Sequence, residues 1–363
     1  MAHRLSLRIA AAGALTLMAA CGGDNGVGPM KPTDPLATAS SIQSLDANFT
    51  SPVFQSFGFA SFYSPVGTAS LAALRTVLRA AQPTLGARRA LSPTESRLAA
   101  AALRAALVPA GGAISAAVLP PAYLGKTLIY NPSAGVYEDD PTRTDAPTNG
   151  VRLILYTVDD LGSPVLPLAE IGYADLKDES SSTFDKLHIQ VVGTLPEPDV
   201  MYLDYAITLT TSSVSVIGFI TDGSTQLDFN ASISATSSGF VIDIRFDVNE
   251  AEAHVRLKLT FAFTSETSFR VIYDFRLQFG TEVVTVTGTE TVTDTNDSGK
   301  LTVRVNGGIY ATITITDGLP SYTGGGGQEL TAEDLTALNT IFEAVAVFFL
   351  RFVELLAPAG TFI

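Results

Sequence analysis

Apolar and polar side chains alternate along most of the chain after residue 126. Between residues 269 and 279, for example, Phe, Val, Tyr, Phe, Leu and Phe occupy every second position. Because successive side chains of a strand point to opposite faces, this alternation predicts antiparallel strands with one buried face. Ten segments show the pattern to differing degrees, at residues 151–155, 187–191, 203–209, 227–233, 240–246, 255–263, 269–279, 285–291, 301–305 and 309–315.

Short turn sequences such as Asp222-Gly223 and Gly307-Gly308 separate these segments. Connections this short favour a meander, in which each strand pairs with the next one in the chain. Since flat sheets of about ten strands are unusual, we expect the sheet to curve. One segment alternates poorly because threonines occupy one of its faces, which favours a place at a sheet edge or mouth. These residues are Thr285, Thr287, Thr289 and Thr291.

Helical patterns precede the strands. Over residues 69–81, leucine and valine recur at i, i+3, i+6 and i+7. Ser92-Pro93-Thr94-Glu95 combines an N-cap, a proline at the first helical position and a glutamate three residues after the cap, and predicts a helix toward Leu107. Aromatic residues also cluster at residues 54–63. We expect this cluster to dock onto the core, with a ligand mouth as the alternative.

The C-terminal segment predicts an amphipathic helix. Gly324–Gly327 indicates a hinge, and Thr331-Ala332-Glu333-Asp334 is typical of a helix start. Apolar residues then recur at helical spacing until Pro358, with charged residues among them that argue against a membrane span. The broad apolar face requires a partner, and the apolar face of the sheet is the expected one. This requirement also favours a soluble sheet over a membrane-spanning barrel, whose lumen is polar.

These patterns predict a mainly β fold of the α+β class. We expect a large curved antiparallel meander sheet of about ten strands, a C-terminal amphipathic helix packed on its apolar face, and a small helical N-terminal part. The expected organisation is a signal peptide at 1–20, a flexible lipid-anchored tether at 21–34, a helical or irregular part at 35–125, an antiparallel β domain at 126–323, and a glycine hinge with the C-terminal helix at 324–363.

Composition narrows the function classes. The 363 residues are 46% hydrophobic, enough for a sizeable core, and the net charge of −14 argues against nucleic acid as a partner. Residues 22–125 contain 7 basic and 4 acidic side chains, whereas residues 126–363 contain 13 basic and 32 acidic ones. A single cysteine excludes an intrachain disulfide and a cysteine-rich zinc site. Three histidines leave little for a histidine metal cluster, and no cofactor is expected.

The N-terminus has the features of an export signal. Arg4 and Arg8 precede an alanine-rich apolar stretch that is short for a transmembrane helix. The stretch ends in Met18-Ala19-Ala20-Cys21, which resembles the lipobox of bacterial lipoproteins, with Met18 in place of the commoner leucine. This resemblance covers the first 21 residues only. An ordinary secretory signal with an incidental cysteine is the alternative.

The lipobox resemblance implies that Cys21 becomes the mature N-terminus and carries acyl chains, which anchor the protein in a membrane. Gly22 follows, where an aspartate would retain such lipoproteins in the inner membrane, so the resemblance implies the outer membrane of the cell envelope. The glycine-rich sequence from Gly22 to Pro29 is typical of a flexible tether.

Candidate chemical motifs are weak. Gly125-Lys126-Thr127 lacks the first glycine of a phosphate-binding loop, since Pro120 occupies that position. The segment from Asp294 to Gly299 resembles half of a calcium loop, but Val305 stands where a bidentate glutamate is needed, so a hairpin turn is favoured. His188 and His254 are expected on polar strand faces.

Acidic groups in the predicted loops are a further candidate for chemistry. Paired carboxylates bind calcium or carry out glycoside hydrolysis, but solvation of a loop is the plainer interpretation. The groups are Glu138-Asp139-Asp140, Asp159-Asp160, and Asp175 with Asp178 and Glu179.

Three function hypotheses follow. In the first, the apolar concave face of a half-barrel holds a lipid or another apolar small molecule, an architecture similar to that of periplasmic lipid-carrying lipoproteins and lipoprotein-localisation factors. In the second, the chain is a structural or interaction lipoprotein with a filled core. The third is an envelope hydrolase with a site that no motif displays. We expect no catalytic residue.

The first hypothesis would place the ligand among six phenylalanines of the predicted strands and C-terminal helix. Core packing is the plainer interpretation of the same residues. They are Phe261, Phe263, Phe275, Phe279, Phe348 and Phe352.

Overall fold

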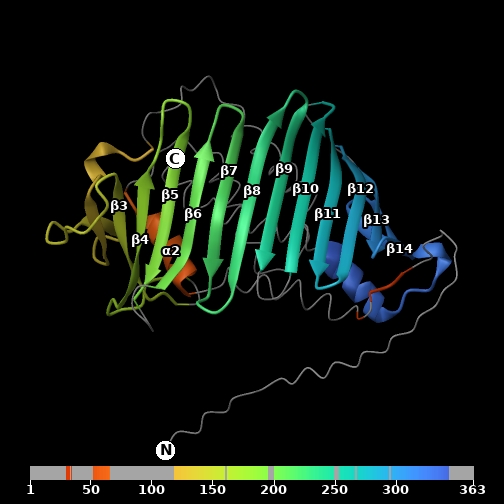
Figure 1. The fold of residues 1–363 in the computed structure, drawn as a ribbon, viewed down its shortest axis with the longest axis horizontal. Helices are drawn as coiled ribbons and strands as arrows, with labels where there is room; N and C mark the ends of the chain where they lie inside the picture. The colour runs from red at the N-terminus through yellow and green to blue at the C-terminus, as the bar shows by residue number, and fades with distance from the viewer. Residues whose placement is uncertain are drawn as a thin grey trace, which may run out of the picture.

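The protein is built on one sheet of fifteen strands, as a computed structural model shows (Figure 1). The structure describes residues 30–32, 34, 52–65, 118–159, 162–194, 200–248, 253–265, 268–293 and 296–342. The strands are β1 (Lys126–Asn131), β2 (Val136–Asp139), β3 (Gly150–Tyr156), β4 (Glu170–Asp178), β5 (Asp185–Gly193), β6 (Val200–Leu209), β7 (Ser213–Thr221), β8 (Gln226–Thr236), β9 (Gly239–Val248), β10 (Ala253–Phe263), β11 (Phe269–Phe279), β12 (Glu282–Val292), β13 (Asp297–Val305), β14 (Gly308–Thr316) and β15 (Leu319–Gly324).

The predicted fold class is confirmed. From β3 to β15 every strand pairs antiparallel with the next, which is the expected meander. The start of the sheet departs from it: β1 and β2 form a hairpin, and β1 pairs in parallel with β3. The chain leaves β1, forms β2 on the outer side, and returns to enter β3, which gives the long connection that a parallel pair requires.

Five strands were not predicted from the alternation pattern: β1, β2, β4, β7 and β15. In β4 the inward positions include Gly172 and Ala174, while the outward ones include Ile171 and Tyr173, so the polarity contrast is lost. In β7 the outward positions include Ile217 and Phe219. Alternation indicates a strand only where its outer face is polar, which explains why β4 and β7 were not expected.

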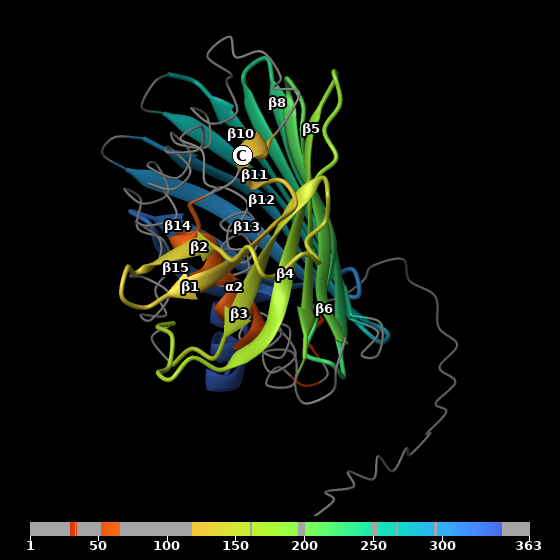
Figure 2. The same ribbon diagram turned by 90° about the vertical axis from the view of Figure 1, so that its left-hand side faces the viewer.

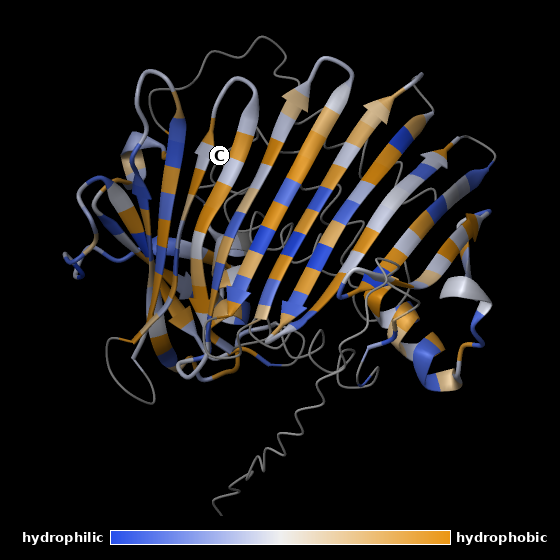
Figure 3. Ribbon diagram, turned by 45° about the vertical axis from the view of Figure 1, so that its right-hand side comes forward, coloured by the Kyte–Doolittle hydropathy of each residue, from blue (hydrophilic) through white to orange (hydrophobic). Residues whose placement is uncertain are grey.

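The two faces of the sheet differ sharply. On β10, Val255 and Leu257 are buried, whereas His254 and Arg256, which alternate with them, are exposed. The alternating bands run along the strands across the sheet (Figure 3). Seen from one end, the sheet curves into an open arc with a helix on its inner side (Figure 2). The inner face therefore forms the core, and the outer face is polar.

The threonine-rich strand β12 lies between β11 and β13, so the expectation of an edge or mouth was wrong. Its threonines pair laterally with outward residues such as Arg276 and Arg304, while Val284 and Val286 face the core. Threonine suits such a half-buried outer surface because of its β-branched side chain. The threonines thus mark the outer face of an interior strand.

The aromatic cluster near the N-terminus forms helix α2 (Pro52–Tyr63), whose Pro52 stands at the start of the helix. Phe57 and Phe59 are buried in the core cluster, and α2 packs against β3 on the inner face. The predicted docking is confirmed. The helix itself was not predicted, because apolar residues on all of its sides leave no helical stripe in the sequence. A short 3-10 turn, η4 (Pro121–Tyr123), precedes the sheet.

The predicted C-terminal helix is present over residues 332–342. Leu338 and Ile341 are fully buried and belong to the core cluster. The expected glycine hinge is instead an ordered turn, η5 (Gly325–Gly327), in which a Cβ on Gly325 would lie 2.1 Å from the Ile309 carbonyl oxygen. The helices predicted at 69–81 and 92–107, and the helix beyond residue 342, lie outside the described residues.

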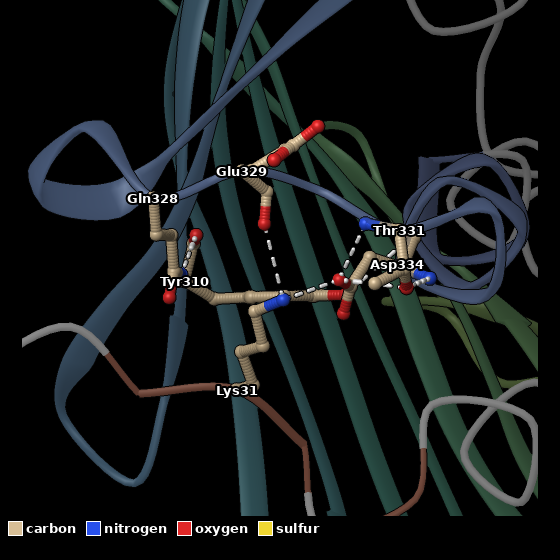
Figure 4. Close-up of polar contacts among 6 residues, drawn as sticks. All are labelled: Lys31, Tyr310, Gln328, Glu329, Thr331 and Asp334. Carbon is tan, nitrogen blue, oxygen red and sulfur yellow. Dashed lines mark hydrogen bonds and ion pairs between the residues drawn. The ribbon is translucent and has the colours of Figure 1, made fainter.

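The start of the C-terminal helix is held by a buried carboxylate, that of Asp334. Its Oδ2 accepts from Thr331 N and Oγ1 at 2.9 Å each, and the Thr331 hydroxyl accepts from Asp334 N, which completes a capping box. Lys31 Nζ lies 2.5 Å from Oδ2, and Tyr310 OH donates to Oδ1 at 2.9 Å (Figure 4). We call Lys31, Tyr310, Thr331 and Asp334 the latch.

A β-bulge supplies the tyrosine of the latch. On β14, Ile309 pairs with Arg304 and Ala311 pairs with Val303, so Tyr310 is the extra residue between them. A bulge changes the direction of a side chain, and the Tyr310 ring is fully buried where its hydroxyl meets Asp334. The latch therefore joins residues far apart in the chain: Lys31, the strand β14 and the C-terminal helix.

We expect Asp334→Asn to destabilise the protein by about 1–2 kcal/mol at pH 7. Burial alone would raise the pKa of Asp334, but the hydrogen bonds from Lys31, Thr331 and Tyr310 outweigh it and lower the pKa to about 2. A lowered pKa stabilises the fold above the usual value of 3.8 and loses this effect as the pH falls toward 2. The difference between variant and wild type should therefore vanish near pH 2 in urea unfolding.

Asp139→Asn is the matched control. Its carboxylate pairs with Lys126 at 2.7 Å, but both side chains are well exposed, so the loss should stay below about 0.5 kcal/mol. Equal effects of the two substitutions at pH 7 would contradict the role of the latch.

Candidate functional site

Four phenylalanines gather where β9 begins, β10 ends and β11 begins. Phe240 stacks on Phe261 with ring centroids 4.4 Å apart, and Phe263 lies 5.9 Å from both Phe240 and Phe269. Phe240 and Phe269 are buried, whereas Phe261 and Phe263 are partly exposed. We call these four residues the aromatic edge, because they end the apolar inner face at one end of the strands.

The predicted site residues occupy different surroundings. Phe275 is fully buried in the core cluster opposite Leu257, and Phe279 lies at the other end of β11, partly buried against the same core. Phe261 and Phe263 belong to the aromatic edge. Of the four candidates that the structure describes, it brings these two together. Phe348, Phe352 and Cys21 lie outside the described residues.

A polar pair lies on the inner face next to the aromatic edge. Tyr273 on β11 donates its hydroxyl to Glu290 Oε2 on β12 at 2.5 Å. In the strand register, Val271 pairs with Phe261 on one side and with Glu290 on the other. One row across β10, β11 and β12 therefore runs from an aromatic ring, through a buried valine, to a carboxylate. Neighbouring strands are about 4.8 Å apart, so this row is roughly 10 Å long.

Burial governs the titration of this pair. It raises the pKa of Glu290, an effect that the Tyr273 hydrogen bond opposes and the charge of Asp297 reinforces. The pKa of Tyr273 is raised well above its usual value, first by burial and then by the Glu290 charge and hydrogen bond. Because the hydroxyl proton of Tyr273 is donated to Glu290, the pair offers acceptor oxygens inside an apolar surface, which suits the polar end of an otherwise apolar molecule.

Glu290 was not predicted as a site residue, because the interpretation of this strand rested on the threonines of its other face. A useful signal was present: Glu290 occupies an inward position in register with Val284 and Val286. A charged residue at an apolar position of the strand period indicates either a paired buried group or a site.

A hydrogen-bonded network covers the outer face over β4, β5 and β6. His188 contacts Glu179 at 3.0 Å through Nδ1 and Asp204 at 2.7 Å through Nε2. Gln190 donates to Asp204 and accepts from Lys177. Both ring nitrogens of His188 thus contact carboxylates. The expected polar-face position is confirmed, but the side chain is half-buried and bound by neighbours.

His254 and Arg152, also on the outer face, are paired as well. His254 Nδ1 lies 2.7 Å from Asp247 at an exposed position. Arg152 forms two hydrogen bonds with Asp175, at 2.7 and 2.8 Å, and its guanidinium lies 3.8 Å from the Tyr173 ring centroid. These contacts order the outer surface and position no nucleophile.

The acidic groups of the loops have structural partners. Asp139 pairs with Lys126, and Asp140 accepts from Thr142, which lowers the pKa of Asp140. Asp178 accepts from the backbone N–H groups of Val118 and Leu119. Within the part of the chain that the structure describes, no three histidine, cysteine or acidic side chains are grouped to hold a metal.

Two motif interpretations bear on turns. Gly125 has a φ of +75° and leads into β1, so Gly125-Lys126-Thr127 does not begin a helix as a phosphate-binding loop would. Thr293 N donates to Asn296 O at 2.9 Å between β12 and β13, as a hairpin turn requires. Asp294 and Thr295 lie outside the described residues.

No protein-family model matches the sequence, and comparisons with curated proteins and with solved structures found no match. Among the described residues, no helix is both long enough and apolar enough to cross a membrane. The candidate site therefore rests on its own geometry: an aromatic edge beside a buried tyrosine–glutamate pair on the inner face.

We expect Glu290→Gln to stabilise the protein at pH 8 and to change little at pH 4. A raised pKa means that the ionised glutamate costs stability as the pH rises above its usual range, and glutamine removes that charge while still accepting from Tyr273. Thermal unfolding at both pH values measures the effect. Glu138→Gln, an exposed carboxylate bound to Asn131, is the control and should show no such difference. Destabilisation by E290Q at pH 8 would contradict this view of the pair.

Proposed function

We propose that the chain is a lipid-anchored cell-envelope lipoprotein whose curved sheet holds an apolar ligand with a polar end. The row Phe261–Val271–Glu290 carries the proposal, since it joins a partly exposed aromatic surface to a hydrogen-bonding pair within one apolar face. Phe261 and Phe263 provide contact for an acyl chain, and Tyr273 with Glu290 provides acceptor oxygens for a ligand hydroxyl, carboxylic acid or amide N–H. The proposal assigns no catalytic residue.

The anchor completes this proposal. Cys21 follows a signal sequence and a lipobox-like segment, and acylation there would hold the sheet at the outer membrane. A soluble ligand-binding body on a membrane anchor suits a protein that takes up or delivers lipids at that surface. Its partners are then the membrane and the apolar ligand.

A structural or interaction lipoprotein is the second candidate. The observation that favours it is the complete burial of central inner-face residues such as Leu257 and Phe275, which leaves no room beside them for a ligand. In that case the aromatic edge is the border of a filled core. The two candidates differ in whether anything binds at Phe261 and Phe263.

Native mass spectrometry of the soluble chain without Cys21, purified from a Gram-negative periplasm, should show a lipid bound in near-stoichiometric amount. Phe261→Ala with Phe263→Ala should lower occupancy by a fluorescent fatty acid about tenfold, because two aromatic contacts are lost. Phe219→Ala on the outer face is the matched control and should leave binding unchanged.

The conservative variant Phe261→Leu keeps an apolar side chain and should fold like the wild type. It therefore separates a loss of binding from a loss of folding. A mass without any ligand, together with no binding of the fatty acid by the folded wild type, would overturn the carrier proposal. It would leave the filled-core candidate.

We expect Cys21→Ser to abolish membrane anchoring. The wild-type chain should yield an N-terminal peptide that begins at Cys21 and carries acyl chains, and it should remain in the membrane fraction after carbonate washing. The serine variant lacks the thiol that is acylated and should be released. Identical fractionation of both chains would contradict the lipobox interpretation.

A further inference from the structure

The latch lies close to the proposed anchor along the chain. Only residues 22–30 separate Cys21 from Lys31, and Lys31 is bound to Asp334 and to the Glu329 carbonyl oxygen (Figure 4). Pro32 next to it is buried. The N-terminal segment is thus fixed to the end of the sheet that bears β14 and the C-terminal helix.

Chain geometry limits how far this end can lie from the anchor. Ten residues span at most about 36 Å when fully extended, and a glycine-rich chain of this length has a mean end-to-end distance of about 16–19 Å. The far end of the sheet has no such restraint among the described residues. Fourteen strand spacings separate β15 from β2, an arc of roughly 67 Å.

We propose that the β14–β15 end of the sheet, with the start of the C-terminal helix, is the surface that faces the lipid bilayer. This inference rests on the proposed acylation of Cys21. The lysine–aspartate ion pair fixes the short tether to one defined end, so that the latch sets the orientation of the sheet at the membrane.

The surface at this end agrees with a lipid neighbour. Met30, Ile309 and Leu335 are each the chain neighbour of a latch residue, and each is more than one-third exposed. Leu319 at the β14–β15 turn is 72% exposed. Glu329 and Glu333 also lie at this end, so attraction to anionic headgroups is not the cause. The short tether brings this end of the sheet close to the bilayer, and the exposed apolar side chains are compatible with contact with lipid.

Without the latch, the anchor would no longer be held close to one end of the sheet. Beyond residue 34, the next described segment that packs on the sheet is α2, which lies against β2 to β6. Its first residue, Pro52, is separated from Cys21 by a chain that spans about 110 Å when extended. Loss of the Lys31–Asp334 pair therefore removes the preference for one end.

The test uses full-length, acylated protein in phosphatidylcholine vesicles that contain a spin-labelled quencher lipid. Cys21 is the only native cysteine, and acylation of its sulfur leaves an introduced cysteine as the only free thiol. A fluorophore is attached at Leu335→Cys or Glu333→Cys near the latch, or at Val136→Cys or Leu166→Cys at the far end, all of which are exposed positions. Quenching should be at least about threefold stronger at the two near positions.

The latch variant is Lys31→Glu, which places like charges side by side, and its control is Lys126→Gln, which removes an exposed lysine of β1. The difference between near and far positions should collapse in the first and persist in the second. Circular dichroism checks that the latch variant is folded, and the comparison within the wild type needs no latch variant at all.

Two failures are distinguishable. Intact mass without acyl chains on wild-type protein would overturn the proposed anchor and the premise of this inference. An acylated protein with equal quenching at both ends, or stronger quenching at Val136 and Leu166, would overturn the orientation alone.

Discussion

The whole structure depends on covering one apolar face. The sheet of fifteen strands satisfies its backbone hydrogen bonds between neighbours, but alternation leaves one face of most strands apolar. Each fully buried Leu, Ile or Phe contributes about 1.5–3 kcal/mol, so that face cannot stay in water. Curvature brings the face to the inside of an arc, and helices from before and after the sheet pack there, as α2 and residues 332–342 show. The two edge strands of the sheet discourage pairing with another chain. β2 has four residues with exposed acids, and Pro320 in β15 removes a backbone donor at the other edge.

Polar groups inside this face have to be fully bonded to be tolerated. Asp334 is nearly inaccessible, and donors from Thr331, Tyr310 and Lys31 repay its desolvation, which its lowered pKa reflects. Glu290 has a weaker arrangement: among the described residues Tyr273 is its one donor, and its pKa is raised. The contrast separates the two roles. A carboxylate saturated by its own chain holds the structure together, whereas one with remaining acceptor capacity beside a partly exposed aromatic surface can serve a ligand.

Sequence reasoning succeeded wherever one physical rule dominated. The strict alternation of β10 and β11, and the capping residues Thr331 and Asp334, predicted the corresponding elements. Sequence reasoning failed where a segment is apolar on its outer side as well as on its inner side. In β7 the outward Ile217 and Phe219 hide the period, and in α2 the burial of all sides leaves no stripe. The latch was beyond reach for another reason: Lys31, Tyr310 and Asp334 meet only through tertiary structure, and the bulge that directs Tyr310 has no signal in a single sequence. Part of the candidate ligand site could be predicted from the sequence, namely Phe261 and Phe263. Glu290 could not, because its place beside them depends on the strand register.

The distribution of burial along the strands constrains how any ligand could enter. Phe275 and Leu257, in the middle of β11 and β10, are fully buried, so the sheet is closed there. Phe261 and Phe263 retain exposure because they stand where β10 ends. Entry between strands would break a ladder of backbone hydrogen bonds, which favours entry along the strand direction, past the aromatic edge. The row from Phe261 to Glu290 crosses three strands and begins at the aromatic edge. A molecule bound there would place its polar end at Tyr273 and its apolar part against the phenylalanines. The unequal burial of the phenylalanines on β10 and β11 favours this arrangement.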